Sequence, residues 1–176
     1  MDLKVFERLS TQKGDFALYS FRFLALAEEK PIKSEFGVLY ARPEMMALSN
    51  LLHHPRIGPE LINGSDSWKR SNKDLGRVLA LAWLALDREP EALSDWPDCW
   101  RVALEKRFPD EWRKLASNCG SGLRALVQSS IELRQATQIC NLSLLAGKDV
   151  DAAALRSTAL RVIGDAISPL EKAARE

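Results

Sequence analysis

The stretch NGSDSWKRSNKDLGR, residues 63 to 77, combines the residue types that bind anions. It places small hydroxyl side chains and the cations Lys69, Arg70 and Lys73 directly before a long apolar segment. A helix that begins there would present unpaired backbone N–H groups and the positive end of its dipole, where phosphate-like anions bind. The stretch lacks the Gly-x-x-x-x-Gly-Lys spacing of a phosphate-binding loop. It is therefore either a binding loop or a solvated loop that ends in an ordinary helix N-cap.

Turn-forming residues and the absence of apolar periodicity before Leu75 predict an exposed loop over residues 64–71. The helix is expected to begin near Asn72, with Ser71 or Asn72 as its N-cap. A functional loop would bring Trp68 together with the cations on one concave surface, beside Arg42 or His54. The candidate binding residues are Arg42, His54, Arg56, Trp68, Arg70, Lys73 and Arg77.

Candidates for catalysis are few. The two histidines, His53 and His54, are adjacent, so on a helix they project about 100 degrees apart and rarely share a metal ion. No serine–histidine–aspartate or cysteine–histidine grouping can be assembled around them. The Asp149-x-Asp151 pair precedes an alanine-rich segment, and helix capping by Asp149 explains it better than metal-assisted catalysis. The sequence therefore predicts no catalytic residue, no metal site and no cofactor, and it favours a protein that is not an enzyme.

Composition describes an ordinary globular chain. Its 176 residues carry 25 basic and 24 acidic side chains, a net charge of +1, which argues against extensive nucleic-acid coating. An odd number of cysteines without a Cys-x-x-Cys pair favours reduced thiols in a cytoplasmic protein. The N-terminus lacks the apolar core of a signal peptide, and no apolar run reaches the roughly 20 residues of a membrane span.

The predicted fold is mainly α-helical, a single-domain bundle of six or seven helices. Residues 43–176 form the helical domain, and residues 1–42 an N-terminal segment packed on the bundle. One helix should begin at Pro43 and end near His53, and another should stop before Pro90. The longest is expected over residues 121–147. The predicted core consists of Leu48, Leu52, Val78, Leu79, Leu104, Leu126, Leu133, Leu144, Leu155 and Val162.

The N-terminal segment fits two patterns. Aromatic residues from Phe16 to Phe23 suit a strand, which favours a short β-hairpin that pairs residues 17–27 with residues 34–41. The spacing of Phe16, Tyr19, Phe23 and Leu26 also fits a helix.

Residues 35–90 resemble part of the nucleotidyltransferase-like proteins of bacterial abortive-infection and toxin systems. The resemblance rests on the helix start at Pro43–Leu48, after an expected strand, and on Lys73-Asp74-Leu75 at a later helix start. It implies that this chain corresponds to the helical half of such a protein, with Lys73 as a nucleotide or substrate contact. The family's catalytic Gly-Ser and Asp-x-Asp arrangement on a sheet is missing.

Three hypotheses follow. The preferred one is a non-catalytic helical module that binds another protein chain or itself, within a bacterial regulatory or defence assembly. The first alternative is a nucleotide- or nucleic-acid-binding module that uses the basic loop 63–77. The second alternative is a degenerate nucleotidyltransferase-like protein.

Overall fold

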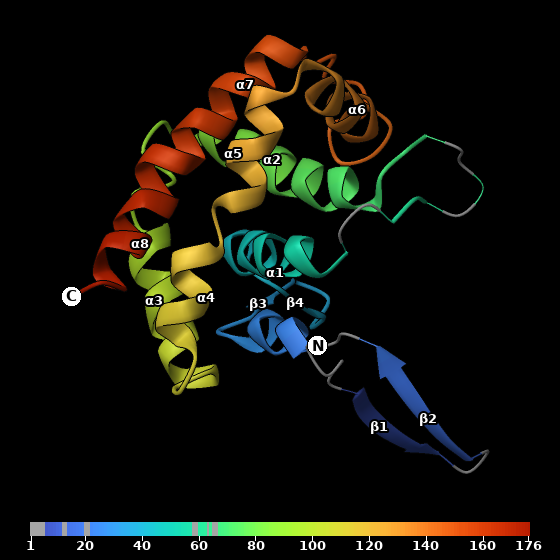
Figure 1. The fold of residues 1–176 in the computed structure, drawn as a ribbon, viewed down its shortest axis with the longest axis vertical. Coiled ribbons are helices and arrows are strands. Elements are labelled where there is room, and N and C mark those ends of the chain that lie inside the picture. The colour runs from blue at the N-terminus through green and yellow to red at the C-terminus, as the bar shows by residue number, and fades with distance from the viewer. Residues whose placement is uncertain (1–5, 12–13, 20–21, 58–59, 63, 65–66) are drawn as a thin grey trace.

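The structure, a computed structural model, describes residues 6–11, 14–19, 22–57, 60–62, 64 and 67–176. The chain starts with an antiparallel hairpin of β1 (Phe6–Thr11) and β2 (Gly14–Tyr19), in which Phe6 pairs with Tyr19 and Leu9 with Phe16. Figure 1 shows this hairpin extending away from the helical body. A two-stranded hairpin is at best marginally stable in water by itself, so it needs to pack against further structure to be stable.

A 3₁₀-helix, η1 (Arg22–Glu28), follows the hairpin, and then the two-residue strands β3 (Ile32–Lys33) and β4 (Leu39–Tyr40) pair with each other. A short N-terminal hairpin is therefore present, but the predicted pairing of residues 17–27 with 34–41 is wrong. The reason lies in Phe23 and Leu26, which are three residues apart and both buried. Side chains at i and i+3 fall on one side of a 3₁₀-helix, so their burial selects this helix over a strand.

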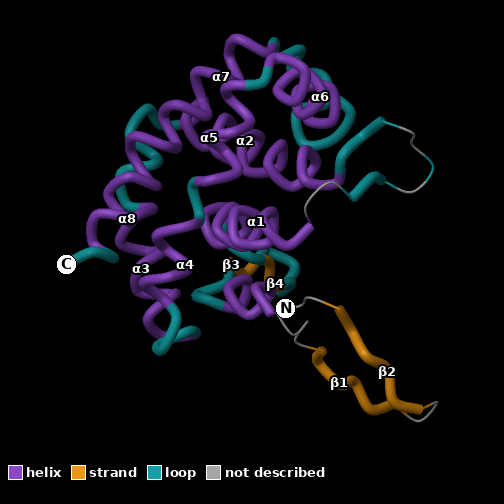
Figure 2. Tube along the Cα trace, viewed as in Figure 1, coloured by secondary structure: helices purple, strands orange, loops and turns teal. Residues whose placement is uncertain are grey.

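Helices make up the rest of the chain, as predicted. Figure 2 shows them in purple around a central pair, α1 and α2. Counting the continuous run of α7, η2 and α8 as one, the described residues contain seven α-type helices, within the predicted six or seven. Their bounds are α1 (Pro43–Ile57), α2 (Arg70–Arg88), α3 (Trp96–Arg107), α4 (Trp112–Asn118), α5 (Ser121–Gln128), α6 (Ser130–Asn141), α7 (Ala152–Arg161), η2 (Val162–Ile167, a π-helix) and α8 (Ser168–Ala173).

The core forms where α1 and α2 pack against each other and against the surrounding helices. Nine of the ten predicted core residues are buried, including Leu48, Val78 and Leu155 at 0% exposure. Leu144 is the exception, because it is 48% exposed while its neighbour Leu145 is fully buried. The prediction extended one helix across both residues, but α6 ends at Asn141 and a turn then orients the two leucines differently.

Several helix boundaries differ from the predictions. Helix α1 continues past His53 to Ile57, although a proline within a helix removes one amide donor and usually ends or kinks it. The expected helix 121–147 divides into α5 and α6 where the Ser129 side chain accepts a hydrogen bond from the Glu132 N–H, at 3.3 Å. Serine three residues before glutamate is a capping-box signature, and here it starts a new helix. Asp151, and not Asp149, caps α7.

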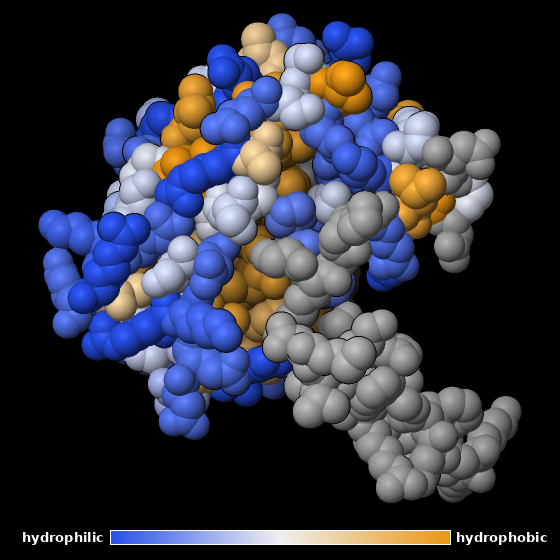
Figure 3. Space-filling model, in the orientation of Figure 1, coloured by the Kyte–Doolittle hydropathy of each residue, from blue (hydrophilic) through white to orange (hydrophobic). Residues whose placement is uncertain are grey.

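The outer surface is mostly polar over the peripheral helices. In Figure 3, hydrophilic side chains predominate around the rim of this face, with scattered hydrophobic ones among them, and hydrophobic atoms gather near its centre, over α1. That distribution is expected for amphipathic helices that bury one stripe. None of the helices in the described part of the chain is both long and apolar enough to cross a membrane.

Candidate functional site

The loop before α2 is closed by a short antiparallel ladder. Leu61 and Lys69 form a β-bridge, the Ile62 N–H donates to the Trp68 carbonyl at 2.8 Å, and the Arg70 N–H donates to the Glu60 carbonyl at 2.8 Å. These bonds hold the two ends of the loop together and bring the chain directly into α2. The helix therefore begins at Arg70, two residues before the predicted start.

Side chains of α6 anchor this loop. Glu132 forms an ion pair with the Lys69 ammonium and accepts a hydrogen bond from the Asn72 amide. The Gln135 carbonyl oxygen accepts from the Lys69 N–H at 3.0 Å and from the Asn72 amide at 2.6 Å. The Gln135 amide in turn donates to the Ser67 carbonyl at 2.8 Å. Two α6 side chains thus accept the hydrogen bonds of the Lys69 N–H and of the Asn72 amide at the start of α2.

The predicted cap is wrong for the same reason. Lys69 is the N-cap residue and makes no side-chain cap bond, while Ser71 and Asn72 are buried at 5% and 3% exposure. Bonds to α6 have taken the place of local capping. Burial alone would raise the pKa of Glu132, but hydrogen bonds from Lys69 and Asn72 outweigh it and hold that pKa below its ordinary value. The Glu132 carboxylate therefore stays charged where it contacts Lys69 and Asn72.

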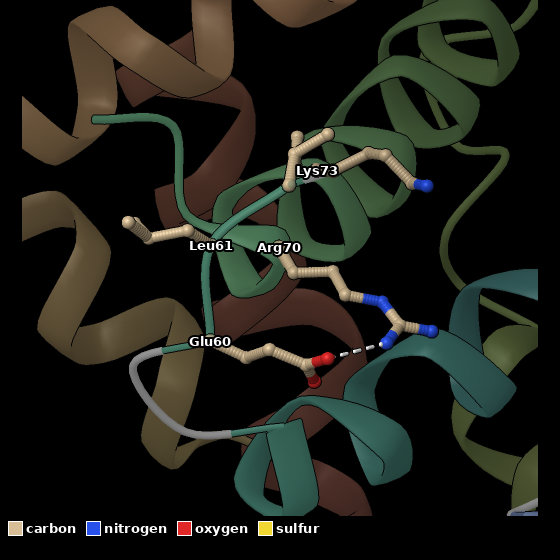
Figure 4. Close-up of a pocket in the computed structure, with 5 residues that line it drawn as sticks. Glu60, Leu61, Arg70 and Lys73 are labelled. Atoms are coloured by element: carbon tan, nitrogen blue, oxygen red, sulfur yellow. Dashed lines mark hydrogen bonds and ion pairs between the residues drawn. The ribbon is translucent and has the colours of Figure 1, made fainter. Parts of the chain in front are cut away.

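A shallow cavity of about 320 Å³ lies between the loop and the first turn of α2. Its lining brings Arg70 and Lys73 together, as Figure 4 shows. The Arg70 guanidinium forms an ion pair with Glu60 at 3.0 Å, so an acidic side chain already offsets its charge. Trp68, partly buried, is not among the lining residues. The full lining is Glu60, Leu61, Ile62, Arg70 and Lys73.

His53, Asp74 and Arg77 tie α1 to α2. The Asp74 carboxylate is buried at 4% exposure, lies 3.0 Å from His53 Nδ1 and is 3.7 Å from the Arg77 guanidinium. A buried carboxylate needs such partners, since desolvation of an unpaired charge is costly. Asp74 is the middle residue of Lys73-Asp74-Leu75, and Leu75 is buried at 2% exposure. Two of these three residues therefore have structural roles, and only Lys73 faces the cavity.

His54 contacts α5 and not the cavity. A Cβ built on Gly122 would lie 1.9 Å from the His54 ring, so the imidazole occupies the space that only a glycine leaves. Burial lowers the pKa of His54, against a smaller opposing effect of the Asp74 charge, and its buried Nδ1 has no hydrogen-bond partner among the described residues. Arg56 lies in α1, but its side chain is outside the described part.

Arg42 belongs to a different region. It precedes α1, forms an ion pair with Glu44 and lines a second cavity of about 510 Å³ between the start of α1, the end of α2 and the start of α3. The Trp100 indole N–H donates to the Glu44 carbonyl at 2.8 Å and fixes the start of α1. The structure thus brings Arg70 and Lys73 together, but neither Arg42 nor His54 lines their cavity.

The side chains that commonly perform covalent or metal chemistry are not arranged for it. All three cysteines are free thiols. Burial raises the pKa of Cys119 and Cys140 to about 12, and burial also raises the pKa of Cys99, so all three disfavour the reactive thiolate. Within the described ranges, histidine, cysteine and carboxylate side chains form no group of three that could hold a metal ion.

Among the side chains whose burial the structure describes, a concentration of exposed apolar residues lies elsewhere, on the turn between β3 and β4 and on β4 itself. Phe36, Val38, Leu39 and Tyr40 are 85%, 62%, 63% and 50% exposed. Residues 34–40 are called the apolar hairpin below. The sequence reasoning assigned this segment to a strand but missed its exposure. The only signal was the run Phe36-Gly37-Val38-Leu39-Tyr40, which looks the same in a buried strand.

The chain matches no protein-family model, no curated protein and no solved structure.

Proposed function

We propose that this chain is a non-catalytic, helical protein-interaction module that works in the bacterial cytoplasm as part of a regulatory or defence assembly. The observation that carries the proposal is the apolar hairpin. Four large apolar side chains are at half exposure or more within five residues, and exposed apolar side chains concentrated in this way commonly mark contact surfaces.

The local geometry supports a preformed contact surface. The Ser34 N–H donates to the Val38 carbonyl at 2.9 Å, and the Val38 N–H donates to the Ser34 hydroxyl at 3.1 Å. Gly37 has φ +78°, a conformation that glycine adopts without strain. These features fix the turn before any partner binds, which lowers the entropy cost of association.

The rest of the molecule gives little support for catalysis. The thiols have raised pKa values, the buried Asp74 bridges two helices, and the cations near the loop are largely paired with carboxylates. Free thiols agree with a reducing compartment, which supports the cytoplasmic assignment.

Native purification tests the proposal. A tagged copy expressed in its own host is compared with the double variant Phe36→Ser/Leu39→Glu, and size and composition are measured by light scattering and mass spectrometry. We expect the wild type to self-associate or to carry a stoichiometric second polypeptide, and the variant to lose either. The fold should survive, because substitutions at exposed positions usually change stability by about 0.5 kcal/mol or less. A monomeric wild type without a partner would refute the proposal.

The nucleotide- or nucleic-acid-binding alternative has one observation in its favour, the cavity that brings Arg70 and Lys73 together. Within the described residues, Lys73 is in no ion pair, whereas Arg70, Lys69 and Arg77 face Glu60, Glu132 and Asp74. This alternative predicts salt-dependent binding of labelled nucleotides or single strands that Arg70→Ala/Lys73→Ala weakens, since phosphate affinity comes from clustered cations. Binding absent at low salt would exclude it.

The degenerate nucleotidyltransferase-like alternative makes a narrower proposal, in which Lys73 contacts a nucleotide or substrate held by a separate catalytic chain. Partial exposure of Lys73 beside the cavity is compatible with this role. Co-purification of a catalytic transferase with the wild type, and its loss in Lys73→Ala, would support it. Loss in the hairpin variant alone would favour the interaction module.

A further inference from the structure

The cavity of about 510 Å³ between α1, α2 and α3 has the size and lining of a small-molecule site. Such sites enclose about 300–1,000 Å³ and combine a mostly apolar wall with a few fixed polar groups. Here the end of α2 and the start of α3 supply the apolar wall, chiefly Leu81, Leu84 and Trp96. The cavity can therefore take the apolar body of a small ligand.

Glu44 is the fixed polar group of this wall. The residue lines the cavity and is only 7% exposed. Its carboxylate oxygen Oε1 accepts a hydrogen bond from the Arg42 guanidinium, and none of the described residues donates a hydrogen bond to Oε2. Since each carboxylate oxygen can accept a hydrogen bond, Glu44 keeps an acceptor for a ligand in the cavity.

Two tryptophans hold this wall in place without a ligand. The Trp100 indole N–H donates to the Glu44 carbonyl at 2.8 Å, and Trp100 is fully buried. Trp96 packs against Trp100 with ring centroids 5.5 Å apart. One tryptophan thus forms part of the apolar wall, and the other fixes the backbone of its acidic residue. A preformed site of this kind lowers the entropy cost of binding.

The charges around the cavity favour a cation. Its lining contains three carboxylates and two guanidinium groups. Arg42 is paired with Glu44, and in the part of the chain that the structure describes Glu89 and Asp95 take part in no ion pair. Burial raises the pKa of the Cys99 thiol in this wall, and the charges of Glu44 and Asp95 raise it further, against the opposing effect of nearby cations. Both carboxylates therefore act on the same part of the wall, where their field stabilises positive charge.

We propose that this cavity binds a small organic cation, with Glu44 Oε2 accepting a hydrogen bond from its ammonium group and with Leu81, Leu84 and Trp96 enclosing its apolar body. A hydrogen bond between an ammonium group and a carboxylate is about twice as strong as a neutral one, so it orients the ligand. Burial of the apolar body adds affinity. The inference does not rest on the proposed interaction function, because the apolar hairpin lies outside this lining.

Isothermal titration calorimetry of the full chain with phenethylamine, an ammonium group on an aromatic body, tests the proposal. We expect a Kd of about 1 mM or tighter. Phenethyl alcohol has the same body without the charge and should bind roughly tenfold more weakly or worse, and the anion phenylacetate should not bind. In amide NMR spectra, the shifts caused by phenethylamine should concentrate in residues 42–44, 81–89 and 92–99.

Three variants test the assigned groups. Glu44→Gln keeps the shape of the side chain and removes its charge, so it should weaken phenethylamine binding roughly tenfold or more. Asp95→Asn, at an exposed position without a side-chain cap bond, should weaken it about two- to fivefold and leave the fold intact. Glu91→Gln is the matched control, because Glu91 is an exposed carboxylate of the same turn outside the lining, and binding should be unchanged. Circular dichroism of each variant separates loss of binding from loss of fold.

No heat and no amide shifts with phenethylamine at about 10 mM would overturn the proposal. Equal affinity for phenethylamine, phenethyl alcohol and phenylacetate would overturn the selection of a cation. Unchanged binding in both Glu44→Gln and Asp95→Asn would overturn the assigned carboxylates. Each of these failures leaves the interaction function standing, since the double variant of the apolar hairpin tests that function separately.

Discussion

Replacing Gly122 by alanine should destabilise the protein, because the new methyl group would overlap the His54 ring. The added Cβ would lie 1.9 Å from His54 Cδ2 and 2.3 Å from Nε2, so the partly buried ring would have to shift. Overpacking of this kind costs typically about 1–3 kcal/mol. Alanine regains at most about 1 kcal/mol over glycine within a helix. We expect a net loss of about 1–2 kcal/mol.

Gly164 provides the matched control. A Cβ at Gly164 meets no atom within 4 Å, and the residue lies inside the helical run of η2. Gly164→Ala should therefore stabilise the protein by about 0.4–1 kcal/mol through reduced freedom of the unfolded chain. Urea unfolding and thermal unfolding, both followed by circular dichroism, measure the free energy of unfolding and the melting temperature of both variants. The melting temperature should fall by roughly 2–8 °C for Gly122→Ala and rise slightly for Gly164→Ala.

A third variant isolates the contact. If the His54 ring causes the overlap, Gly122→Ala should cost much less in a His54→Ala background, and the difference measures the coupling between the two sites. Equal costs in both backgrounds, or a Gly122→Ala variant as stable as Gly164→Ala, would show that His54 does not occupy this space. The assignment of His54 to packing, in place of binding, would then be wrong.

Three further predictions test other parts of the fold. Leu145→Ala should cost about 2–5 kcal/mol, whereas Leu144→Ala should change the free energy of unfolding by about 0.5 kcal/mol or less, both by urea unfolding; equal costs would contradict the observed turn after α6. Burial alone would raise the pKa of Glu29, but bonds from two basic side chains of α3 outweigh it and leave that pKa below its ordinary value of 4.5. Its contribution to stability is therefore complete above about pH 4.5 and is lost as the pH falls through the folded-state value; a Glu29→Gln variant should lose this part of the pH dependence, and an unchanged profile would refute the assignment. Cys119 and Cys140 should resist iodoacetamide at pH 8 in the folded protein and react once it is unfolded, as mass spectrometry would show; rapid labelling of the folded protein would contradict their burial.

Most of the helical architecture was predictable because apolar periodicity and proline positions are local signals. Pro43 marks the start of α1, and the stripe that includes Val78 and Leu79 predicts the buried face of α2. Both signals depend on neighbours within about one helical turn, which the sequence displays directly.

The errors arose where distant residues compete with local signals. Asn72 is a good N-cap by type, but Glu132 and Gln135, about sixty residues away, take its amide hydrogen bonds. The division between α5 and α6 was detectable in principle from Ser129-x-x-Glu132, yet a continuous apolar stripe masked it. The loss of the Asn72 cap could not be predicted, because nothing in the sequence shows that α6 lies beside the start of α2.

The candidate site was predicted only in part. That Arg70 and Lys73 lie on one face of α2 follows from their spacing of three residues along the helix. The separation of Arg42 from both, and the packing of His54 against α5, depend on how whole helices are arranged. The exposure of Phe36 depends on what lies above it in three dimensions, and residue type gave no indication of that.

Photocrosslinking in living cells is the most direct test of the interaction surface. A photoreactive amino acid is placed at position 36 in one strain and at position 131 in another, because Phe36 and Ile131 are both highly exposed, at 85% and 75%. If the apolar hairpin is the contact surface, irradiation yields a discrete crosslink to a second polypeptide from position 36 and none from position 131. No crosslink from position 36, or the same products from both positions, would contradict it.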